Sequence, residues 1–599
     1  MRYWLVLMVF VVQGVGAWPQ GIPQPLSGSD ASHYKALFAA AEKGRWEKTH
    51  AGAVKDDVLL PHAKAALYQS KGYKASYGEL TGWLEKYPAY PEAAEVYRLA
   101  NIKRPKPTTT CKTTKVKVKG KKKLQKKRTC TTTGSWGPEA PLPWSIQKRK
   151  MAQDAADRAR EQEYAGMGPE RAAARREVLG QSWRLRNAKK WDAALELLNR
   201  TGTRRMMGDE RWQGELVQIA DAQQVSQNWK VMHRAGMLGA KAQGPVRDDA
   251  LWWAGFGAYR LGDYREAVDA WEELVRIEPE HGTHAARGAY WAGRAYEKLG
   301  NRERANRMYQ QAARDPVAYY GILAAKKLGE TPRLDWTAPR LNADDVKAVL
   351  RVDSAKRALA LVQVGQVSTG QMALRTADED IPTAYTETMA ALGLELHMPA
   401  VALQMGKALY PNQIRPAMLF PLAEEWKPRG PVVMERPLLL AITRQESAFH
   451  PTIGSHVGAQ GLMQLMPPTA RYIVNKTGRG SASNLHDPIN NMTLGHDYLA
   501  YLQGKTEGDL IAMIAAYNAG LGNVNKWKRR EIAPASDPAL FVESIPFDET
   551  RGYVQKVLAN LWIYESRLGK SSWSLTSLAR NQWPQRWVAV APDERDIGG

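Results

Sequence analysis

The chain has little cysteine, little phenylalanine and a shortage of acidic residues. Its 599 residues include two Cys and 7 Phe, against 24 Tyr and 21 Trp, and 61 Asp and Glu against 84 Lys and Arg. Beyond the first residues, no stretch approaches the ~20 apolar residues of a membrane-spanning helix, which excludes a multi-pass membrane protein. The 44% hydrophobic and 24% charged residues are typical of globular proteins. A chain this long exceeds one hydrophobic core and should form three or four domains.

The excess of basic residues gives a formal net charge of +23, which predicts an anionic partner. The charge is unevenly placed, because Lys103–Arg128 contains 13 Lys or Arg and no acid. The other 573 residues therefore carry only +10. The total charge favours nucleic acid as the partner, but no nucleic-acid-binding module is present, so we expect no nucleic-acid partner. The basic segment instead predicts electrostatic contact with an anionic envelope surface, with a solvated loop as the alternative.

The N-terminus has the pattern of a secretory signal. Arg2 precedes a short apolar run, and Val15-Gly16-Ala17 offers small residues to a signal peptidase, which predicts a cleaved signal peptide over residues 1–17. An uncleaved anchor or a buried strand is the alternative. In an exported protein an even pair of cysteines indicates a disulfide, here between Cys111 and Cys130. Both are flanked by threonines in near-mirror order.

A helical repeat follows the basic segment. The segment Ala258–Ala267 is echoed by Ala295–Ala305, with Leu-Gly pairs 38 residues apart, which is typical of a tetratricopeptide-type solenoid of helical hairpins. The expected organisation is a superhelical solenoid at 18–340 with a basic insertion at 103–143, a helical linker domain at 341–430, a third domain at 431–570 and a tail at 571–599. Alternation around Gly120 predicts a two-stranded ribbon in the insertion.

Glu446 stands out in the third domain. It lies near the end of a helix predicted from Arg436, seven residues after Leu439 and four after Ile442, and so falls on the apolar face. Burial and the negative end of the helix dipole both raise a carboxyl pKa, as a general acid near neutral pH requires. The alternative is a carboxylate that curls outward at a frayed helix end.

Four blocks, in order over about 110 residues, resemble the soluble lytic transglycosylases. They are Glu446-Ser447 with Phe449, Gly458–Gln464, Ala516–Gly520, and Ile545–Phe547 with Glu549–Arg551, Tyr553 and Val554. The segment Tyr319–Ala325 also resembles the family, whereas the insertion between the cysteines has no counterpart. The resemblance implies an all-α fold: a helix-hairpin superhelical solenoid, a helical linker domain and a C-terminal, lysozyme-like catalytic domain of the goose type.

The resemblance also implies an activity. These enzymes cleave the β-1,4 bond between N-acetylmuramic acid and N-acetylglucosamine in peptidoglycan and leave 1,6-anhydromuramoyl ends. Glu446 is then the single catalytic residue, first as acid and then as base. The implied partners are peptidoglycan glycan strands and their peptide stems, the implied location is the periplasm, and no cofactor or metal is expected. The sequence does not predict an oligomeric state.

Further site residues follow from the matching positions. The substrate-binding positions implied by the resemblance are Ser455, Gln464, Met466, Ala516, Tyr517, Asn518 and Glu549. Ser455, Gln464 and Met466 would line the sugar cleft, Tyr517 would lie near the catalytic carboxyl, and Glu549 would face the peptide stem. Three of these positions have structural alternatives. Met466 would then fill the core, Asn518 would cap its helix, and Glu549 would only pair with Arg551.

Two other functions stay open. A hydrolytic muramidase of the goose-lysozyme type would share the fold but activate water with a second carboxylate. Its candidates are Asp487, Asp497, Asp509 and Glu543, none of which lies in the matched blocks. A non-catalytic peptidoglycan-binding scaffold built on the solenoid is the other alternative.

Overall fold

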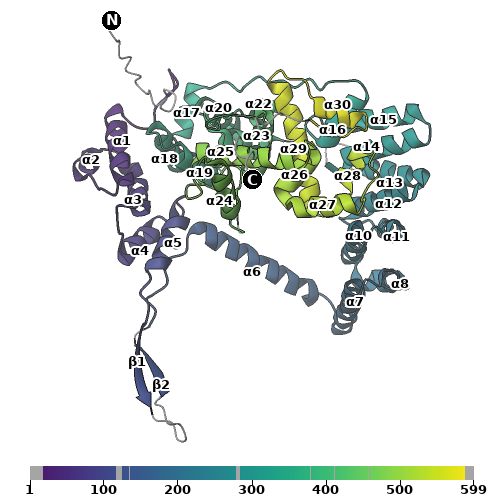
Figure 1. The fold of residues 1–599 in the computed structure, drawn as a ribbon, viewed down its shortest axis with the longest axis horizontal. Helices are drawn as coiled ribbons and strands as arrows, with labels where there is room; N and C mark the ends of the chain where they lie inside the picture. The colour runs from purple at the N-terminus through teal and green to yellow at the C-terminus, as the bar shows by residue number, and fades with distance from the viewer. Residues whose placement is uncertain are drawn as a thin grey trace, which may run out of the picture. The chain divides into compact units, whose positions relative to one another are not determined.

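The structure is a computed structural model, and it describes residues 18–116, 125–133, 135–277, 283–377, 380–410, 412–455 and 457–586. The signal-peptide prediction for residues 1–17 lies outside these residues, as does the end of the tail from residue 587. The described chain is almost entirely helical, with one two-stranded sheet (Figure 1), which confirms the all-α prediction. No helix in the described ranges is both long and apolar enough to cross a membrane.

The chain divides into two compact units, Met1–Glu163 with Pro339–Val401, and Tyr164–Ala338 with Ala402–Gly599. The elements of the first unit are α1 (Gly28–Glu42), α2 (Lys48–Ala53), η1 (Asp57–Leu59), α3 (Leu60–Gln69), α4 (Tyr77–Lys86), α5 (Ala93–Lys103), β1 (Thr108–Val116), β2 (Gln125–Thr133), α17 (Ala343–Val349), α18 (Asp353–Gln363), α19 (Val367–Ala377), η3 (Thr383–Tyr385) and α20 (Thr386–Glu395). Two helices cross a unit boundary in the sequence, α6 (Trp144–Ala165) and α21 (Pro399–Leu409).

The first unit joins the N-terminal helices to part of the predicted linker. The Lys356 ammonium on α18 lies 2.6 Å from the Asp56 carboxylate, and the Leu26 amide donates to Gln363 Oε1 at 2.9 Å. The predicted boundary at residue 340 is close to the start of this segment. The packing nevertheless associates 339–401 with the N-terminal helices, and the domain limits remain a prediction.

The hairpin β1–β2 extends from the helices α4 and α5 (Figure 1). Its strands are antiparallel, and their register places Cys111 opposite Cys130, Lys115 opposite Lys126 and Thr113 opposite Arg128. Cys111 is disulfide-bonded, which supports the pairing predicted from the sequence. A free-standing two-stranded hairpin is marginal in water, so a cross-strand disulfide would stabilise it mainly by restricting the unfolded loop.

The second unit contains the repeats and residues 431–570, the predicted third domain. Its elements are α7 (Pro169–Asn187), α8 (Trp191–Asn199), α9 (Thr203–Met207), α10 (Asp209–Ser226), α11 (Trp229–Gly239), α12 (Arg247–Leu261), α13 (Tyr264–Ile277), α14 (Thr283–Lys298), α15 (Arg302–Ala312), α16 (Tyr319–Lys327), α22 (Pro416–Leu419), α23 (Arg436–Ser447), α24 (Pro467–Thr477), α25 (Pro488–Lys505), α26 (Leu510–Ala519), α27 (Leu521–Arg529), α28 (Pro538–Glu543), α29 (Asp548–Arg567) and α30 (Trp573–Ala579). The helix α30 lies within the predicted tail, at 571–599, and packs on α16.

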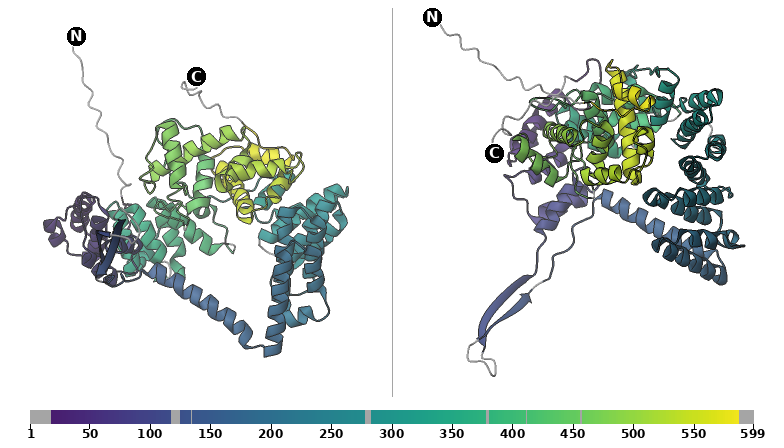
Figure 2. Two further views of the ribbon diagram at one scale, coloured as in Figure 1. Left: turned by 60° about the horizontal axis from the view of Figure 1, so that its bottom comes forward. Right: turned by 45° about the vertical axis from the view of Figure 1, so that its right-hand side comes forward.

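The helical hairpins α10 to α15 stack in sequence (Figure 2), as the repeat predicts. Their core is aromatic: the ring centroids of Trp252 and Trp271 lie 5.6 Å apart, and those of Trp271 and Trp291 lie 6.3 Å apart. All three rings are fully buried. Gly255 lies directly against Trp271, where a Cβ would collide with the indole. Part of the tryptophan excess therefore fills the solenoid core.

Arginines of the solenoid bind the third domain within the second unit. Arg260 of α12 donates to Ile532 O at 3.0 Å and to Ser544 Oγ at 2.7 Å, and Arg294 of α14 pairs with Asp537 at 2.7 Å. Arg287 pairs with Glu543, which is completely buried and also accepts a hydrogen bond from Tyr320. Because Glu543 is the last residue of α28 and α29 begins at Asp548, these contacts hold the chain where it enters α29.

Candidate active site

Glu446 occupies the last turn of α23, as predicted. Pro437 stands in the first turn, the following residues are buried, and the helix ends at Ala448, whose φ is 49°. Phe449 follows with φ of 65° and is fully buried. Two successive left-handed residues turn the chain sharply away from the helix axis. Glu446 is therefore held at a helix end that is anchored on both sides by buried side chains.

Burial controls the Glu446 carboxyl. Desolvation raises its pKa to about 7, the hydrogen bond from Tyr553 opposes that rise, and the charge of Glu549 adds to it. The Tyr553 hydroxyl donates to Glu446 Oε1 at 2.7 Å. The raised pKa agrees with the sequence-based expectation and leaves a proton available near neutral pH. It rests on burial, not on a neighbouring acid alone.

Tyr517 lies close to this carboxyl. Its hydroxyl donates to Met463 O at 2.7 Å, and burial followed by the charge of Glu446 raises the Tyr517 pKa well above its ordinary value. The Tyr517 ring also contacts Tyr498, with centroids 5.3 Å apart. Tyr517 therefore stays a neutral phenol that ties α26 to the loop after α23.

That loop carries Ser455 and Gln464. The Ser455 hydroxyl accepts a hydrogen bond from the Ala459 amide at 2.9 Å, and Gln464 Nε2 donates to Gly461 O at 2.8 Å and to Ile453 O at 3.1 Å. Gln464 has φ of 46°, an uncommon conformation for a residue with a side chain. Both side chains are partly exposed and hold the loop in one conformation.

Asn491, on α25, also anchors this loop by hydrogen bonds. Its Nδ2 donates to Gln460 O at 2.9 Å and to Leu485 O at 2.8 Å, while its Oδ1 accepts from the Met463 amide at 2.8 Å. Gly461 has φ of 80°, and a Cβ there would collide with Leu485 O and Asn491. Glycine is thus required by both conformation and space.

The remaining predicted residues are Met466, Asn518, Glu549 and Ala516, and they differ in exposure. Met466 is 38% exposed, so it is not core filler. Asn518 Nδ2 lies 3.5 Å from Glu549 Oε1, and Asn518 Oδ1 accepts from Thr550 at 2.6 Å. Glu549 therefore contacts Asn518, whereas Arg551 pairs with Asp548 and lies near Glu543. Ala516 is fully buried, so it has no surface for a ligand, and we assign it a packing role instead.

The four candidates for a second carboxylate have other partners. Asp487 caps α25 by accepting from the Asn490 amide, and Asp509 caps α26 and pairs with Lys528 at 2.8 Å. Asp497 pairs with Arg479 at 2.7 Å, and Glu543 pairs with Arg287. In the part of the chain that the structure describes, Glu549 is the acid whose charge acts on Glu446.

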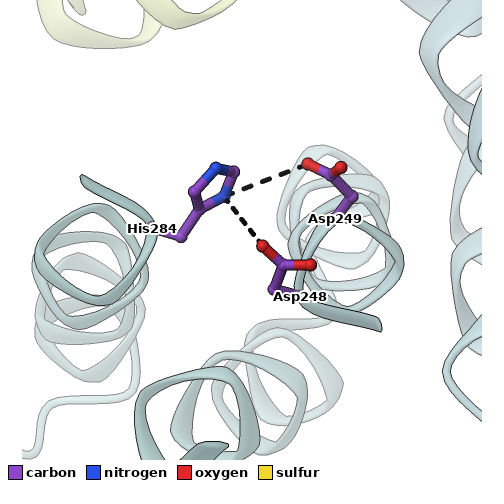
Figure 3. Close-up of side chains that lie close together, drawn as sticks. All are labelled: Asp248, Asp249 and His284. Carbon is purple, nitrogen blue, oxygen red and sulfur yellow. Dashed lines mark ion pairs between the residues drawn. The ribbon is translucent and has the colours of Figure 1, made fainter. Parts of the chain in front are cut away.

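A separate polar cluster lies in the solenoid (Figure 3). His284 Nδ1 is 3.8 Å from Asp248 Oδ2 and 3.9 Å from Asp249 Oδ1. Burial, and then the charge of Asp248, raise the Asp249 pKa. Both aspartates lie in the first turn of α12, where the helix dipole favours anions. We interpret the cluster as an ion pair between neighbouring repeats.

The hydrogen bond from Tyr553 to the Glu446 carboxyl was not predicted from the sequence. Tyr553 was recognised only as part of a matching block, and Asn491 and Tyr498 were not singled out. The spacing of Tyr553 from the start of α29 gives no indication that its hydroxyl reaches a helix more than a hundred residues earlier. The one available signal was general: a buried tyrosine usually needs a hydrogen-bond partner for its hydroxyl.

Known proteins match the C-terminal part of the chain in sequence. Residues 431–538 match the family described as "Transglycosylase SLT domain", and 544–572 match "Soluble lytic transglycosylase helical domain". Residues 249–281 and 288–315 match "Tetratricopeptide repeat", which confirms the predicted repeat. The soluble lytic murein transglycosylase of Escherichia coli K12 is 42% identical over 151 residues, or 25% of this chain and 23% of the relative. That of Haemophilus influenzae, called putative, is 44% identical over 128 residues, or 21% of each.

The sequence match thus spans less than a quarter of these relatives, whereas the structural match is broader. The 70 kDa soluble lytic transglycosylase of Escherichia coli has a TM-score of 0.53 at 19% identity, covering 93% of this chain and 99% of that one. A lytic transglycosylase from Pseudomonas aeruginosa has the same TM-score at 21% identity, with the same coverage. The fold is therefore shared along nearly the whole chain.

Proposed function

We propose that the chain, whose residues 431–538 and 544–572 match soluble lytic transglycosylase families, cleaves peptidoglycan between N-acetylmuramic acid and N-acetylglucosamine and leaves 1,6-anhydromuramoyl ends. The observation that carries the proposal is the buried Glu446 carboxyl with a pKa of about 7, bonded to Tyr553, inside the matched domain. The substrate is a wall polymer, and the proposed location is the periplasm, reached through the signal peptide at 1–17.

The reaction needs one carboxyl in two roles. Protonated Glu446 gives its proton to the glycosidic oxygen as the bond to the muramoyl C1 breaks. The resulting carboxylate then removes the proton from the muramoyl C6 hydroxyl, whose oxygen closes on C1 to form the anhydro ring. The internal hydroxyl is tethered to the reacting sugar, so its effective concentration exceeds that of water. Ordinary glycosidases require a second carboxylate for a nucleophile or base, and this reaction does not.

The residues around Glu446 support these roles. Tyr553 holds the carboxyl in place and favours its ionised form, which matters when the carboxylate must act as base. We propose that Ser455, Gln464 and Met466 line the sugar cleft and that Tyr517 fixes the loop beside it. The half-buried Asn518 and the exposed Glu549 would face the peptide stem.

Product masses test the proposal directly. Purified sacculi digested by the protein should give fragments one water lighter than reducing-end fragments, because no water is consumed. Fragments with reducing ends alone would instead establish the hydrolytic muramidase. The four acids considered for that role are occupied by other partners, which favours the transglycosylase. Binding to sacculi without any soluble product would establish the scaffold.

The pH dependence provides a further prediction. Since the protonated form of Glu446 begins the reaction, kcat should fall about tenfold per pH unit above pH 7 and level off below it. Tyr553→Phe removes the hydrogen bond that lowers this pKa, so the basic limb should move to higher pH while the rate falls about 10- to 100-fold. Tyr472→Phe, at an exposed position, is the matched control. A basic limb that stays in place in Tyr553→Phe would contradict this account.

A further inference from the structure

The β1–β2 hairpin has basic residues at strand positions on both of its faces. Neighbouring residues of a strand lie on opposite faces, so the positions of Lys112 and Lys127 fall on one face and those of Lys115, Lys126 and Arg128 on the other. A flat membrane or a flat protein surface can meet only one face of a ribbon. A flexible polymer with charges along its length can reach both faces.

The register also sets like charges against each other. Lys115 lies directly opposite Lys126, an arrangement that destabilises a strand pair. The repulsion between these lysines therefore lowers the stability of the hairpin, and the disulfide at Cys111 offsets the loss. A bound anion would relieve this repulsion. This favours an anion-binding element over a purely structural ribbon.

The base of the hairpin adds an exposed aromatic ring. Trp136 is 54% exposed, and the charged groups of Arg104 and Lys106 lie 5.7 Å and 5.9 Å from its ring centroid. Arg104 Nη1 lies 3.5 Å from Glu139, which is itself exposed. Amphipathic rings beside cations suit polar ligands that carry acidic groups. Basic residues thus occur both along the strands and at the base of the insertion.

We propose that the β1–β2 hairpin is a docking arm for the carboxylates on the peptide stems of peptidoglycan. The proposal rests on the proposed function, because it gives the same polymer a second contact away from Glu446. The stems supply repeated carboxylates on a flexible chain, which matches cations on both faces. The attraction is electrostatic, so it should weaken as salt shortens the Debye length from about 10 Å at 0.1 M to about 3 Å at 1 M.

The test measures binding without turnover. The full chain with Glu446→Gln is pelleted with purified sacculi, alone and with Lys112, Lys115, Lys126 and Lys127 all changed to Gln. A matched control changes four exposed lysines of the same unit, Lys35, Lys43, Lys71 and Lys86, to Gln. Circular dichroism checks that each protein retains its helical content. Parallel samples use sacculi whose carboxylates have been amidated, and vesicles of equal parts phosphatidylcholine and phosphatidylglycerol.

We expect the hairpin variant to bind sacculi at least tenfold more weakly at low salt and the control variant to bind within about twofold of the parent. Amidated sacculi and 1 M salt should remove the difference. Equal losses in both variants would overturn the proposal. It would also be overturned if the parent bound amidated sacculi as tightly as untreated sacculi. Tighter hairpin-dependent binding to the vesicles than to the sacculi would also overturn it and point to a membrane. Product masses from the wild-type protein test the enzymatic function separately, so either proposal can fail alone.

Discussion

Glu446→Gln should reduce the release of soluble peptidoglycan fragments by about 10²- to 10⁴-fold, the contribution typical of a positioned general acid. Glutamine keeps the size of the side chain and can still accept the hydrogen bond from Tyr553, but its amide has no acidic proton to transfer to the glycosidic oxygen. It also cannot become the base that takes the C6 proton. The measurement is the rate of anhydro-product formation from sacculi, with Glu507→Gln at an exposed position as the control.

The same substitution has a pH-dependent effect on stability. The folded-state pKa of Glu446, about 7, exceeds the ordinary carboxyl value of 4.5. The folded protein therefore binds the proton more tightly, and this group makes stability fall as the pH rises from about 4.5 to about 7. Glutamine removes the cost, so the variant should melt at a higher temperature than the wild type at pH 8 and at the same temperature at pH 4. A variant less stable at pH 8 would show that the loss of activity comes from misfolding.

Glu543→Ala should be the most destabilising single change that we identify. It removes the partner of Arg287, whose guanidinium is otherwise packed on the Trp252 ring, and leaves Tyr320 without its acceptor. Leaving one buried charge without its partner typically lowers the free energy of unfolding by about 3–5 kcal/mol. The melting transition that includes α29 should fall by on the order of 10 °C. Activity should fall with it, since α29 carries Tyr553.

The partner variant distinguishes a broken ion pair from a lost carboxylate function. Arg287→Met together with Glu543→Gln replaces the pair by neutral groups and should recover most of the stability. If Glu543 were the base of a hydrolase, the double variant would be stable but inactive. Recovery of both stability and anhydro products would place Glu543 outside the chemistry.

Local patterns predicted the elements and the acid. Pro437, the apolar spacing and Glu446 defined α23, and the paired Leu-Gly motifs defined the repeat that the family match confirms. The ribbon in the insertion followed from alternation around a glycine, and β1 and β2 occupy its two sides. These features depend on residues close together in the sequence, where spacing alone determines which side chains share a face.

Contacts between distant residues were not predictable in the same way. The bond from Tyr553 to Glu446 joins α29 to α23, and the pair of Arg287 and Glu543 joins the solenoid to α28. Glu543 was one of four candidates for the second carboxylate of a hydrolase, because the residues around it give no sign of a partner arginine more than 250 residues earlier. Ala516 was assigned to the substrate for its place in a motif, although α26 buries it completely. Burial of this kind could not be predicted from the motif, because tertiary packing decides exposure.

The base of the hairpin has a use in protein engineering. The Gly137 amide donates to Pro105 O at 2.9 Å, and Arg104 Nε donates to Gly137 O at 2.8 Å, so the chain leaves and re-enters the helical unit at one pinned point. Inserted segments are tolerated best where the two ends already lie together and the surrounding backbone bonds stay intact. A fluorescent or affinity domain could therefore replace the residues between Lys106 and Trp136. The protein would then carry its label far in sequence from the catalytic helix.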